Sequence, residues 1–167
     1  MKAKLFWVRG PWPGRLAVMP GPRGGDWLDD EMKTWRDGGV DIVVSLLTRD
    51  EADEFDLIDE ALACNTAGMQ YILFPIADRT VPKASRAFTE LLTQLGDRLS
   101  AGKNIAIHCR QGIGRAALVA SCLLVLAGLE AEEAISRVTE ARGCSVPETK
   151  EQRDWIVTFV NEIHVPI

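Results

Sequence analysis

The sequence predicts an α/β fold in three layers, with a central, mainly parallel sheet flanked by helices. Short β-branched or apolar runs alternate with longer segments of helical period, the pattern of strands joined by crossover helices. The run 118–127 is apolar nearly all round, which predicts a helix buried at the centre of the molecule. With 167 residues, the chain is long enough for one sizeable core, so we expect a single domain over 1–167.

The N-terminal part is expected to begin with two short strands, 5–8 and 16–18, separated by a turn rich in proline and glycine. Asp26 is a candidate N-cap for a helix that ends at the glycine pair 38–39. The β-branched run 41–47 is typical of a buried parallel strand.

A helix is expected over 55–66 and a further strand over 70–74, stopped by a proline. The segment 76–82 is expected to be a loop, and 84–101 a helix of about five turns with leucines on one side. Strand 104–108 leads into a glycine-bearing loop. Three helices complete the predicted order, over about 115–127, 130–142 and 148–163.

The segment 108–115 reads His-Cys-Arg-Gln-Gly-Ile-Gly-Arg and connects a predicted strand to a predicted helix. Such a loop suits a phosphate, because backbone N–H groups converge there, the helix dipole favours negative charge and a guanidinium binds two oxygens. Cys109 would lie beneath the phosphorus as a nucleophile, with Arg115 on the equatorial oxygens. A cysteine and an arginine at this spacing are a weak signal alone, and the strand, the two glycines and the helix make it specific.

Attack on a phosphate ester expels an alkoxide or phenolate, which needs a proton from a general acid. Asp78 is the best candidate, because it follows a strand expected to be parallel to the one before Cys109. Loops at the carboxyl edge of a parallel sheet meet there. From spacing alone, a turn or capping role for Asp78 is equally compatible.

The formal net charge is −5 and the pI is about 5.1, which argues against broad nucleic-acid binding. One anionic substrate in a locally basic pocket remains compatible with this charge. That pocket could be supplied by Arg79, Arg110, Arg115 and Arg142.

Four cysteines without a Cys-x-x-Cys pair, and only two histidines, predict no metal site. We expect Cys64 and Cys122 in the core, Cys144 in a loop, and a reducing cytoplasm that keeps Cys109 a thiol. No apolar run is long enough for a transmembrane helix, and the N-terminal segment does not read as a signal peptide. We expect a monomer, and the acidic residues between 50 and 56 are expected to form a solvated face.

These motifs together resemble the cysteine-dependent dual-specificity and tyrosine protein phosphatase family, and within it the kinase-associated phosphatase type. Segment 108–115 matches the family's signature loop, and 75–78 followed by Pro82 resembles its general-acid loop. The strand 43–48 with Glu51, and 141–143 with Pro147 and Gln152, are similar to its core strand and C-terminal helical segment. The resemblance extends over nearly the whole chain.

The resemblance implies a cysteine phosphatase fold and a protein phosphatase that uses a phosphocysteine intermediate and no metal or organic cofactor. Its implied substrate is phosphotyrosine, with dual specificity as an open alternative. It implies nucleophile Cys109, phosphate-binding Arg115 and general acid Asp78. It also implies hydrogen bonding by His108 near the nucleophile and a role for Gln152 in placing the hydrolytic water. Phosphate contacts are implied for the backbone of Arg110, Gln111, Gly112, Ile113 and Gly114.

Ala116 departs from the family pattern, which has serine or threonine directly after the arginine. That hydroxyl assists departure of the thiolate when the intermediate is hydrolysed, so alanine is expected to slow the second step. Ala116 therefore also favours a slow or near-inactive module that binds phosphoproteins. Phosphatases for phosphoinositides or RNA 5′-phosphates would use the same loop, but the acidic pI and lack of a lysine-rich loop count against them. A sulfur-transfer or arsenate-reducing enzyme is a further, less favoured class.

Overall fold

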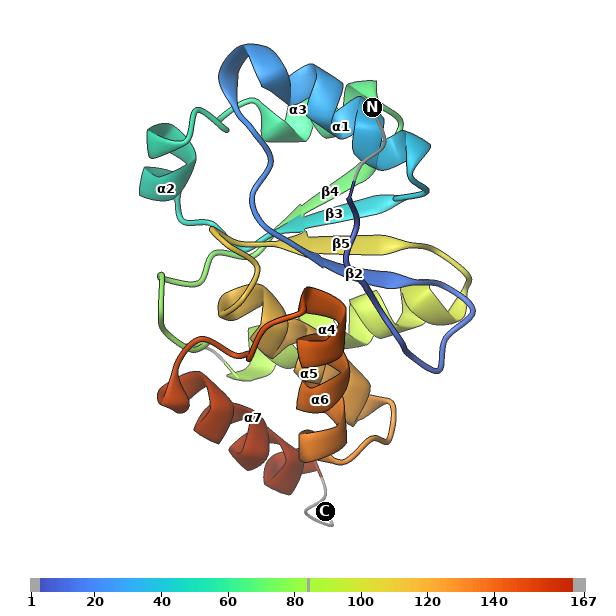
Figure 1. Ribbon diagram of the computed structural model, residues 1–167, viewed down its shortest axis with the longest axis vertical. Coiled ribbons are helices and arrows are strands. Elements are labelled where there is room, and N and C mark those ends of the chain that lie inside the picture. Colours follow the sequence, from blue (N-terminus) through green and yellow to red (C-terminus); the bar gives the residue numbers. More distant parts are fainter. Residues whose placement is uncertain (1–3, 84, 164–167) are drawn as a thin grey trace.

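The computed structural model describes residues 4–83 and 85–163, and within them five strands form one sheet in the order β1-β2-β5-β3-β4 (Figure 1). β1 pairs with β2 in antiparallel fashion, and the remaining neighbours are parallel. The predicted mainly parallel sheet is therefore confirmed. The strands are β1 Trp7–Val8, β2 Leu16–Met19, β3 Ile42–Ser45, β4 Gln70–Leu73 and β5 Ile105–His108.

The parallel register decides which loops meet. His108, at the end of β5, lies opposite Met19 of β2 and Ser45 of β3, and Ser45 lies opposite Leu73 of β4. The loops that follow these four strands therefore leave the same edge of the sheet, where side chains from distant parts of the sequence converge.

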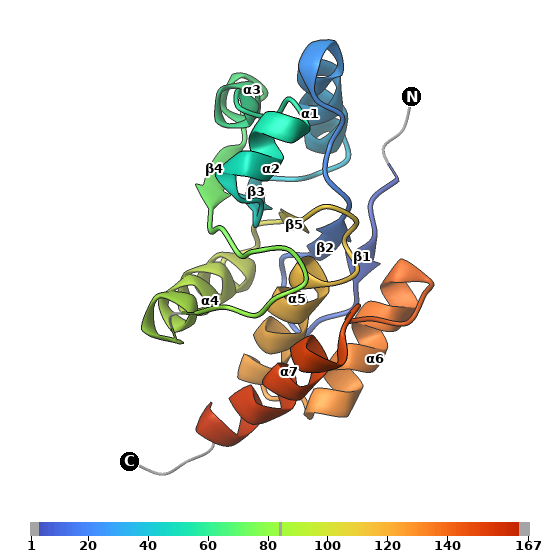
Figure 2. The same cartoon turned by 90° about the vertical axis from the view of Figure 1, so that its left-hand side faces the viewer.

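Helices cover both faces of the sheet (Figure 2). One face carries α1 Leu28–Asp37 and α3 Glu60–Thr66, whose buried side chains form a cluster with Val43 and Ala106 of the sheet. The other face carries α4 Ser85–Ser100, α5 Arg115–Leu126, α6 Ala131–Arg142 and α7 Lys150–Ile163. None of the helices in the described ranges is both long and apolar enough to cross a membrane.

The central helix α5 is buried along Arg115–Val125 and packs against α4, α6 and α7 as well as the sheet. The sequence predicts this burial from its apolar composition, and the structure confirms it. Because α5 is held on all sides, its N-terminus and the preceding loop have a rigid support.

The predicted helix over 55–66 is wrong in its first half. The chain instead forms α2, Arg49–Glu54, and then α3. Thr48 starts α2 with a capping box, in which its hydroxyl accepts from the Glu51 N–H and the Glu51 carboxylate accepts from the Thr48 N–H. Asp56, with a φ of 57°, turns the chain between the two helices.

The predicted cap at Asp26 is also wrong. A short 3-10 turn, Gly25–Trp27, leads into α1, and no side chain caps either element. Asp26 lies inside the first turn, where its negative charge still interacts favourably with the helix dipole.

Candidate active site

The loop between β5 and α5, residues 109–114, brings one of its backbone N–H groups to the Cys109 side chain. The Gly112 N–H donates to Cys109 Sγ at 3.3 Å. Gly112 has a φ of +73°, and a Cβ there would lie 2.6 Å from the Met19 carbonyl carbon. Glycine is therefore required by both the torsion and the close approach of β2. Cys109 itself is 3% exposed and begins the loop that leads into α5, a helix whose N-terminal dipole favours an anion.

Arg115, the first residue of α5, is 1% exposed and is held in place by Glu51. Arg115 Nη1 lies 2.7 Å from Glu51 Oε1, and Nη2 lies 2.8 Å from Oε2, a bidentate pair of the strongest class. Nη1 also donates to the Ile76 carbonyl at 2.8 Å. The guanidinium plane is therefore fixed before any substrate arrives.

The pairing of Glu51 with Arg115 keeps both side chains charged as well as fixed in position. Burial alone would raise the pKa of Glu51, but hydrogen bonds from Arg115 and the Thr48 N–H, with the Arg115 charge, hold it below its usual value. Burial would lower the pKa of Arg115, and Glu51 together with the Cys109 and Asp78 charges raises it instead. Glu51 is thus not part of a solvated face, which corrects that expectation for this residue.

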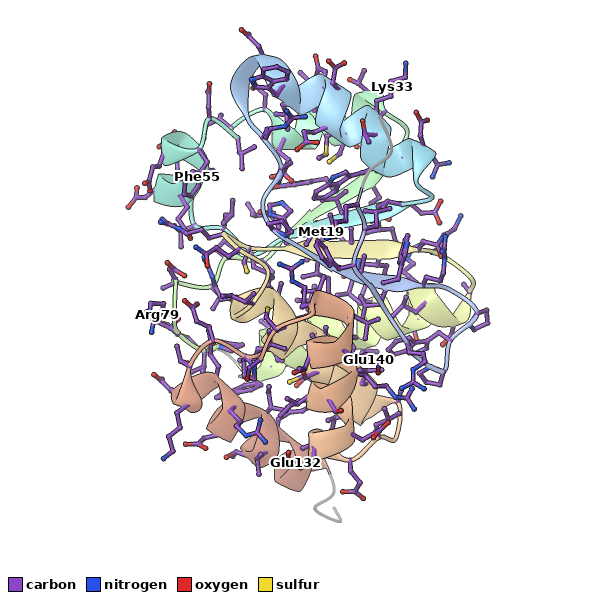
Figure 3. The ribbon with its side chains drawn as sticks, viewed as in Figure 1. Met19, Lys33, Phe55, Arg79, Glu132 and Glu140 are labelled. Carbon is purple, nitrogen blue, oxygen red and sulfur yellow. The ribbon has the colours of Figure 1, made fainter. Side chains whose placement is uncertain are left out.

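Asp78 lies on the loop after β4 and points into the same site. Asp78 Oδ1 lies 3.1 Å from Arg115 Nη2, and Oδ2 lies 3.7 Å from Arg110 Nε. The next residue, Arg79, has a φ of 60°, a conformation that is costly without glycine. The turn sends Arg79 outward (Figure 3), where Nη1 meets Glu148 Oε1 at 2.7 Å.

A cavity of about 210 Å³ brings these groups together. It joins the general-acid candidate, the thiol and the guanidinium in one hollow at the carboxyl edge of the sheet. Three of the four arginines expected around it line it, whereas Arg142 does not. The lining residues are Asp78, Arg79, Cys109, Arg110, Gln111, Ile113, Gly114, Arg115 and Glu148.

Arg142 supports the loop from outside this cavity. Its Nη2 donates to the Gln111 carbonyl at 3.0 Å, and its guanidinium lies 3.8 Å from the centre of the Phe6 ring. Burial lowers the pKa of Arg142, while the charges of Cys144 and Cys109 raise it in part. Two of its buried nitrogens, Nε and Nη1, have no hydrogen-bond partner among the described residues.

His108 is fully buried beside the nucleophile. Its Nε2 lies 2.6 Å from Glu60 Oε2, and its Nδ1 lies 3.4 Å from the Cys109 carbonyl oxygen. The ring also meets Trp35 edge-on. These contacts fit the predicted support of the Cys109 region, and Glu60, which the sequence does not suggest, supplies the shortest of them.

Gln152 is buried at the start of α7 and contacts the loop that carries Asp78. Its Nε2 donates to the Thr80 carbonyl at 3.2 Å, and its Oε1 accepts from the Thr149 N–H at 3.1 Å. A Cβ at Gly114 would lie 3.1 Å from the Gln152 amide, so this side chain also packs on the phosphate loop.

Ala116 is fully buried in the first turn of α5. Cys64 and Cys122 are buried and Cys144 is exposed, and all four thiols are free. Burial, helped by the charge of Glu60, raises the pKa of Cys64 to about 12, and burial raises the pKa of Cys122. These two thiols therefore stay protonated.

Besides Glu60, two residues of the site have no functional role that the sequence predicts. Glu51 carries a usable signal, because Thr48 and Glu51 have the spacing of a capping box, although its pairing with Arg115 is not visible in the sequence. Glu148 carries none.

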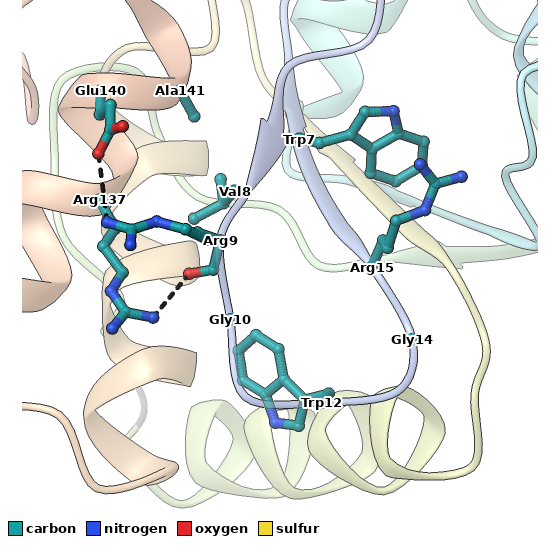
Figure 4. A pocket seen from close by; sticks show the side chains of 10 residues that line it. All are labelled: Trp7, Val8, Arg9, Gly10, Trp12, Gly14, Arg15, Arg137, Glu140 and Ala141. Carbon is teal, nitrogen blue, oxygen red and sulfur yellow. Dashed lines mark hydrogen bonds and ion pairs between the residues drawn. The ribbon is translucent and has the colours of Figure 1, made fainter.

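A larger hollow, of about 490 Å³, lies elsewhere, where the turn between β1 and β2 faces α6 (Figure 4). None of the predicted site residues lines it. The candidate chemistry is therefore confined to the smaller cavity at the carboxyl edge of the sheet.

Comparison with known proteins gives a consistent result. Residues 39–161 match the family model "Dual specificity phosphatase, catalytic domain". The chain is 24% identical over 153 residues to the cyclin-dependent kinase inhibitor 3 of Rattus norvegicus, an alignment that covers 89% of this chain and 72% of the rat protein.

Two solved structures are similar to this chain over nearly its whole length. One is kinase associated phosphatase with its catalytic-site cysteine substituted by serine, at a TM-score of 0.88 and 20% identity over 100% of this chain and 99% of that one. The other is Tk-PTP in the active form, at a TM-score of 0.73 and 26% identity over 97% and 99%. At 20% identity, the similarity to kinase associated phosphatase shows only that the two folds are alike.

Proposed function

The chain belongs to the dual-specificity phosphatase family, and from this premise we propose that it hydrolyses phosphotyrosine in proteins through a phosphocysteine intermediate at Cys109. The family and the class of enzyme, a protein-tyrosine or dual-specificity phosphatase, rest on the match over 39–161. One observation carries the assignment of roles. Cys109, Arg115 and Asp78 line a single cavity, although Asp78 and Arg115 are 37 positions apart in the chain.

In the first proposed step, the Cys109 thiolate attacks phosphorus in line. The S–P bond forms as the bond from phosphorus to the ester oxygen breaks, and Asp78 in its acid form gives its proton to that oxygen. The Arg115 guanidinium and the N–H groups of 110–114 hold the equatorial oxygens, whose charge they stabilise. Arg115 is already oriented by Glu51, so little reorganisation accompanies the reaction.

In the second step, water attacks the phosphocysteine. The Asp78 carboxylate left by the first step accepts a proton from the water, and the thiolate leaves as inorganic phosphate forms. A role for Gln152 in placing this water is supported by its position between the Asp78 loop and Gly114. Both steps use groups of the protein alone and need no metal or organic cofactor.

Tyrosine phosphate is the preferred substrate class in this proposal because of depth and charge. Cys109 is 3% exposed, so a long aryl phosphate reaches it more readily than the phosphate of a serine. The rim arginines are already paired, Arg79 with Glu148 at 2.7 Å and Arg110 with Glu54 at 3.3 Å. A substrate with several phosphates would therefore meet carboxylates as well as cations at the rim.

The remaining attributes of the proposal follow from the chemistry. We place the protein in a reducing cytoplasm, which keeps the Cys109 thiol available for attack. It is proposed to act as a monomer, as one domain over 1–167, on phosphoprotein substrates rather than nucleic acids.

A substrate panel tests the proposed class. A phosphotyrosine peptide is expected to give the highest kcat/KM, above the same peptide with phosphothreonine or phosphoserine and above a phosphoinositide or 5′-phosphorylated RNA. Phosphate release measured under one set of conditions decides this. A phosphoinositide or RNA that exceeds every phosphopeptide would overturn the assignment to proteins.

Asp78→Asn is expected to slow hydrolysis according to the leaving group. A positioned acid contributes about 10²–10⁴-fold, so kcat/KM for an alkyl or poorly leaving aryl phosphate falls by that amount. An aryl phosphate with a strongly acidic phenol loses much less. Asp53→Asn, on the exposed side of α2, is the matched control, and equal losses for all leaving groups would exclude Asp78 as the acid.

A second candidate function, a module that binds phosphoproteins and releases them slowly, is favoured by Ala116. On this view the phosphocysteine accumulates, because no hydroxyl after Arg115 assists thiolate departure. Rapid mixing with para-nitrophenyl phosphate is then expected to show a burst followed by a slow steady state. A burst of one equivalent with almost no turnover afterwards would favour the module.

Ala116→Ser is expected to raise the steady-state rate by about fivefold, because one hydrogen bond contributes about 1 kcal/mol. The burst amplitude should fall at the same time. Ala117→Ser, the next buried residue of α5, controls for the cost of burying a hydroxyl. An unchanged steady-state rate for Ala116→Ser would contradict this explanation of slow thiolate departure.

A further inference from the structure

A second hollow, of about 180 Å³, adjoins the candidate active site and shares two wall residues with it, Cys109 and Arg110. We propose that it is a subsite for an uncharged, apolar side chain next to the phosphorylated residue of the substrate. This proposal rests on the proposed function, and it adds a sequence preference to it. The full lining is Gly21, Pro22, Arg23, Gly24, Leu47, Phe55, Leu57, Cys109 and Arg110.

One wall of the hollow is the segment 21–24, which runs past the phosphate loop after β2. The Gly21 N–H donates to the Arg110 carbonyl at 3.1 Å, and a Cβ at Gly21 would lie 3.0 Å from the Cys109 carbonyl oxygen. Gly24 approaches the opposite wall so closely that a Cβ there would lie 2.1 Å from the Phe55 carbonyl oxygen. The hollow is therefore already formed, which favours affinity because no loop has to become ordered.

The lining decides the chemistry of the occupant. Pro22, Leu47, Phe55 and Leu57 present apolar surface, and none of the lining residues is acidic. A cavity of about 150 Å³ lined by apolar side chains holds a benzene molecule. The hollow therefore suits one side chain of the size of leucine, methionine or phenylalanine. A charged side chain of either sign would lose water against the apolar walls, and the two arginines of the lining are already paired with Glu31 and Glu54.

Arg110 divides the hollow from the catalytic cavity. Its guanidinium lies 4.7 Å from the centre of the Phe55 ring and 3.3 Å from Glu54 Oε2, and its Nε lies 3.7 Å from Asp78 Oδ2. Phe55 and Arg79 lie on the same flank of the molecule (Figure 3). A peptide whose phosphate occupies the catalytic cavity would cross Arg110 and bring an adjacent residue to the apolar hollow.

The test is a series of phosphotyrosine peptides that differ at the positions directly before and after the phosphotyrosine. Wild-type protein is expected to prefer leucine over alanine at one of these positions by about tenfold in kcat/KM, as burial of the larger side chain predicts. Lysine and glutamate at that position should be no better than alanine. The hydrolysis rate of para-nitrophenyl phosphate serves as the reference, because this substrate has no neighbouring residue to place in the hollow.

Leu57→Phe fills the hollow and is expected to reduce the leucine preference to about one, with the para-nitrophenyl phosphate rate unchanged. Leu28→Phe is the matched control, since Leu28 is similarly buried in the same core cluster but does not line the hollow. Thermal unfolding checks that both variants fold, and the wild-type peptide series decides the proposal if either does not.

Three results would overturn the proposal. Equal kcat/KM for leucine and alanine at both positions, in a protein that hydrolyses these peptides, overturns the subsite alone. A preference that survives in a folded Leu57→Phe variant does the same. Hydrolysis of para-nitrophenyl phosphate without hydrolysis of any phosphopeptide overturns both the subsite and the proposed protein substrate, so the two failures are distinguishable.

Discussion

Replacing Cys109 with serine is expected to lower kcat/KM for para-nitrophenyl phosphate and phosphotyrosine peptides by about four orders of magnitude or more. A serine hydroxyl stays protonated at neutral pH and attacks phosphorus poorly, whereas a thiolate is the nucleophilic form of cysteine. Arg115 and the loop N–H groups are untouched, so the variant should still bind a phosphotyrosine peptide. Titration calorimetry measures that binding, and phosphate release measures turnover.

Cys144→Ser is the control for this variant, because Cys144 is exposed and does not line the cavity. Its activity should equal that of the wild type. Denaturing mass spectrometry after rapid mixing should detect one added phosphoryl group on the wild type and none on Cys109→Ser. A folded Cys109→Ser protein with nearly full activity would rule out the thiol as nucleophile.

Glu51→Ala is expected to lower the free energy of unfolding by about 3–5 kcal/mol, the cost of leaving a buried charge without its partner. Arg115 is 1% exposed, and Glu51 is its bidentate acceptor. The guanidinium then loses its fixed orientation, so kcat/KM should also fall. Chemical denaturation and steady-state kinetics measure the two effects.

Glu54→Gln controls for charge on the same helix. Its pair with Arg110 is solvent-exposed, so the expected change in stability is at most about 1 kcal/mol. The double variant Glu51→Leu with Arg115→Met should recover much of the lost stability, because apolar replacements avoid both desolvation costs. It should have no activity. A Glu51→Ala protein as stable as the wild type would contradict the structural role of the pair.

The Glu51–Arg115 pair also makes the free energy of unfolding depend on pH. The pKa of Glu51 is lower in the folded protein than its usual value, so its stabilising contribution is complete above about pH 4.3, the usual value for glutamate. The contribution is lost as the pH falls from there through the folded-state pKa. The difference in stability between wild type and Glu51→Gln should therefore shrink on acidification across that range.

Much of the fold and site could be predicted from local patterns. The strand, glycines and helix around Cys109 are consecutive in the chain, so their spacing predicts both the phosphate loop and its candidate nucleophile. Asp78 is predicted because the topology of a parallel sheet places the loops at its carboxyl edge together. In the structure β3 pairs with both β4, which precedes Asp78, and β5, which precedes Cys109. Ala116 is recognised because it directly follows Arg115.

Other features depend on contacts that no local pattern encodes. The sequence groups Glu51 with its exposed acidic neighbours, since charge alone does not show which carboxylate has a buried partner. The pairing of Glu60 with His108 spans 48 residues, and Arg79 meets Glu148 across 69. The adjoining hollow needs walls from separate segments of the chain.

The order of residues along the chain is thus enough to predict the fold class, the phosphate loop and the candidate nucleophile, cation and acid. Each of these depends on residues that are neighbours in the chain or on the alternation of strands and helices. The folded chain is needed to see which carboxylates hold the charged groups in place and where the apolar hollow lies. The physical reason is that burial and charge pairing act through space, between segments whose separation along the chain leaves no trace in local periodicity.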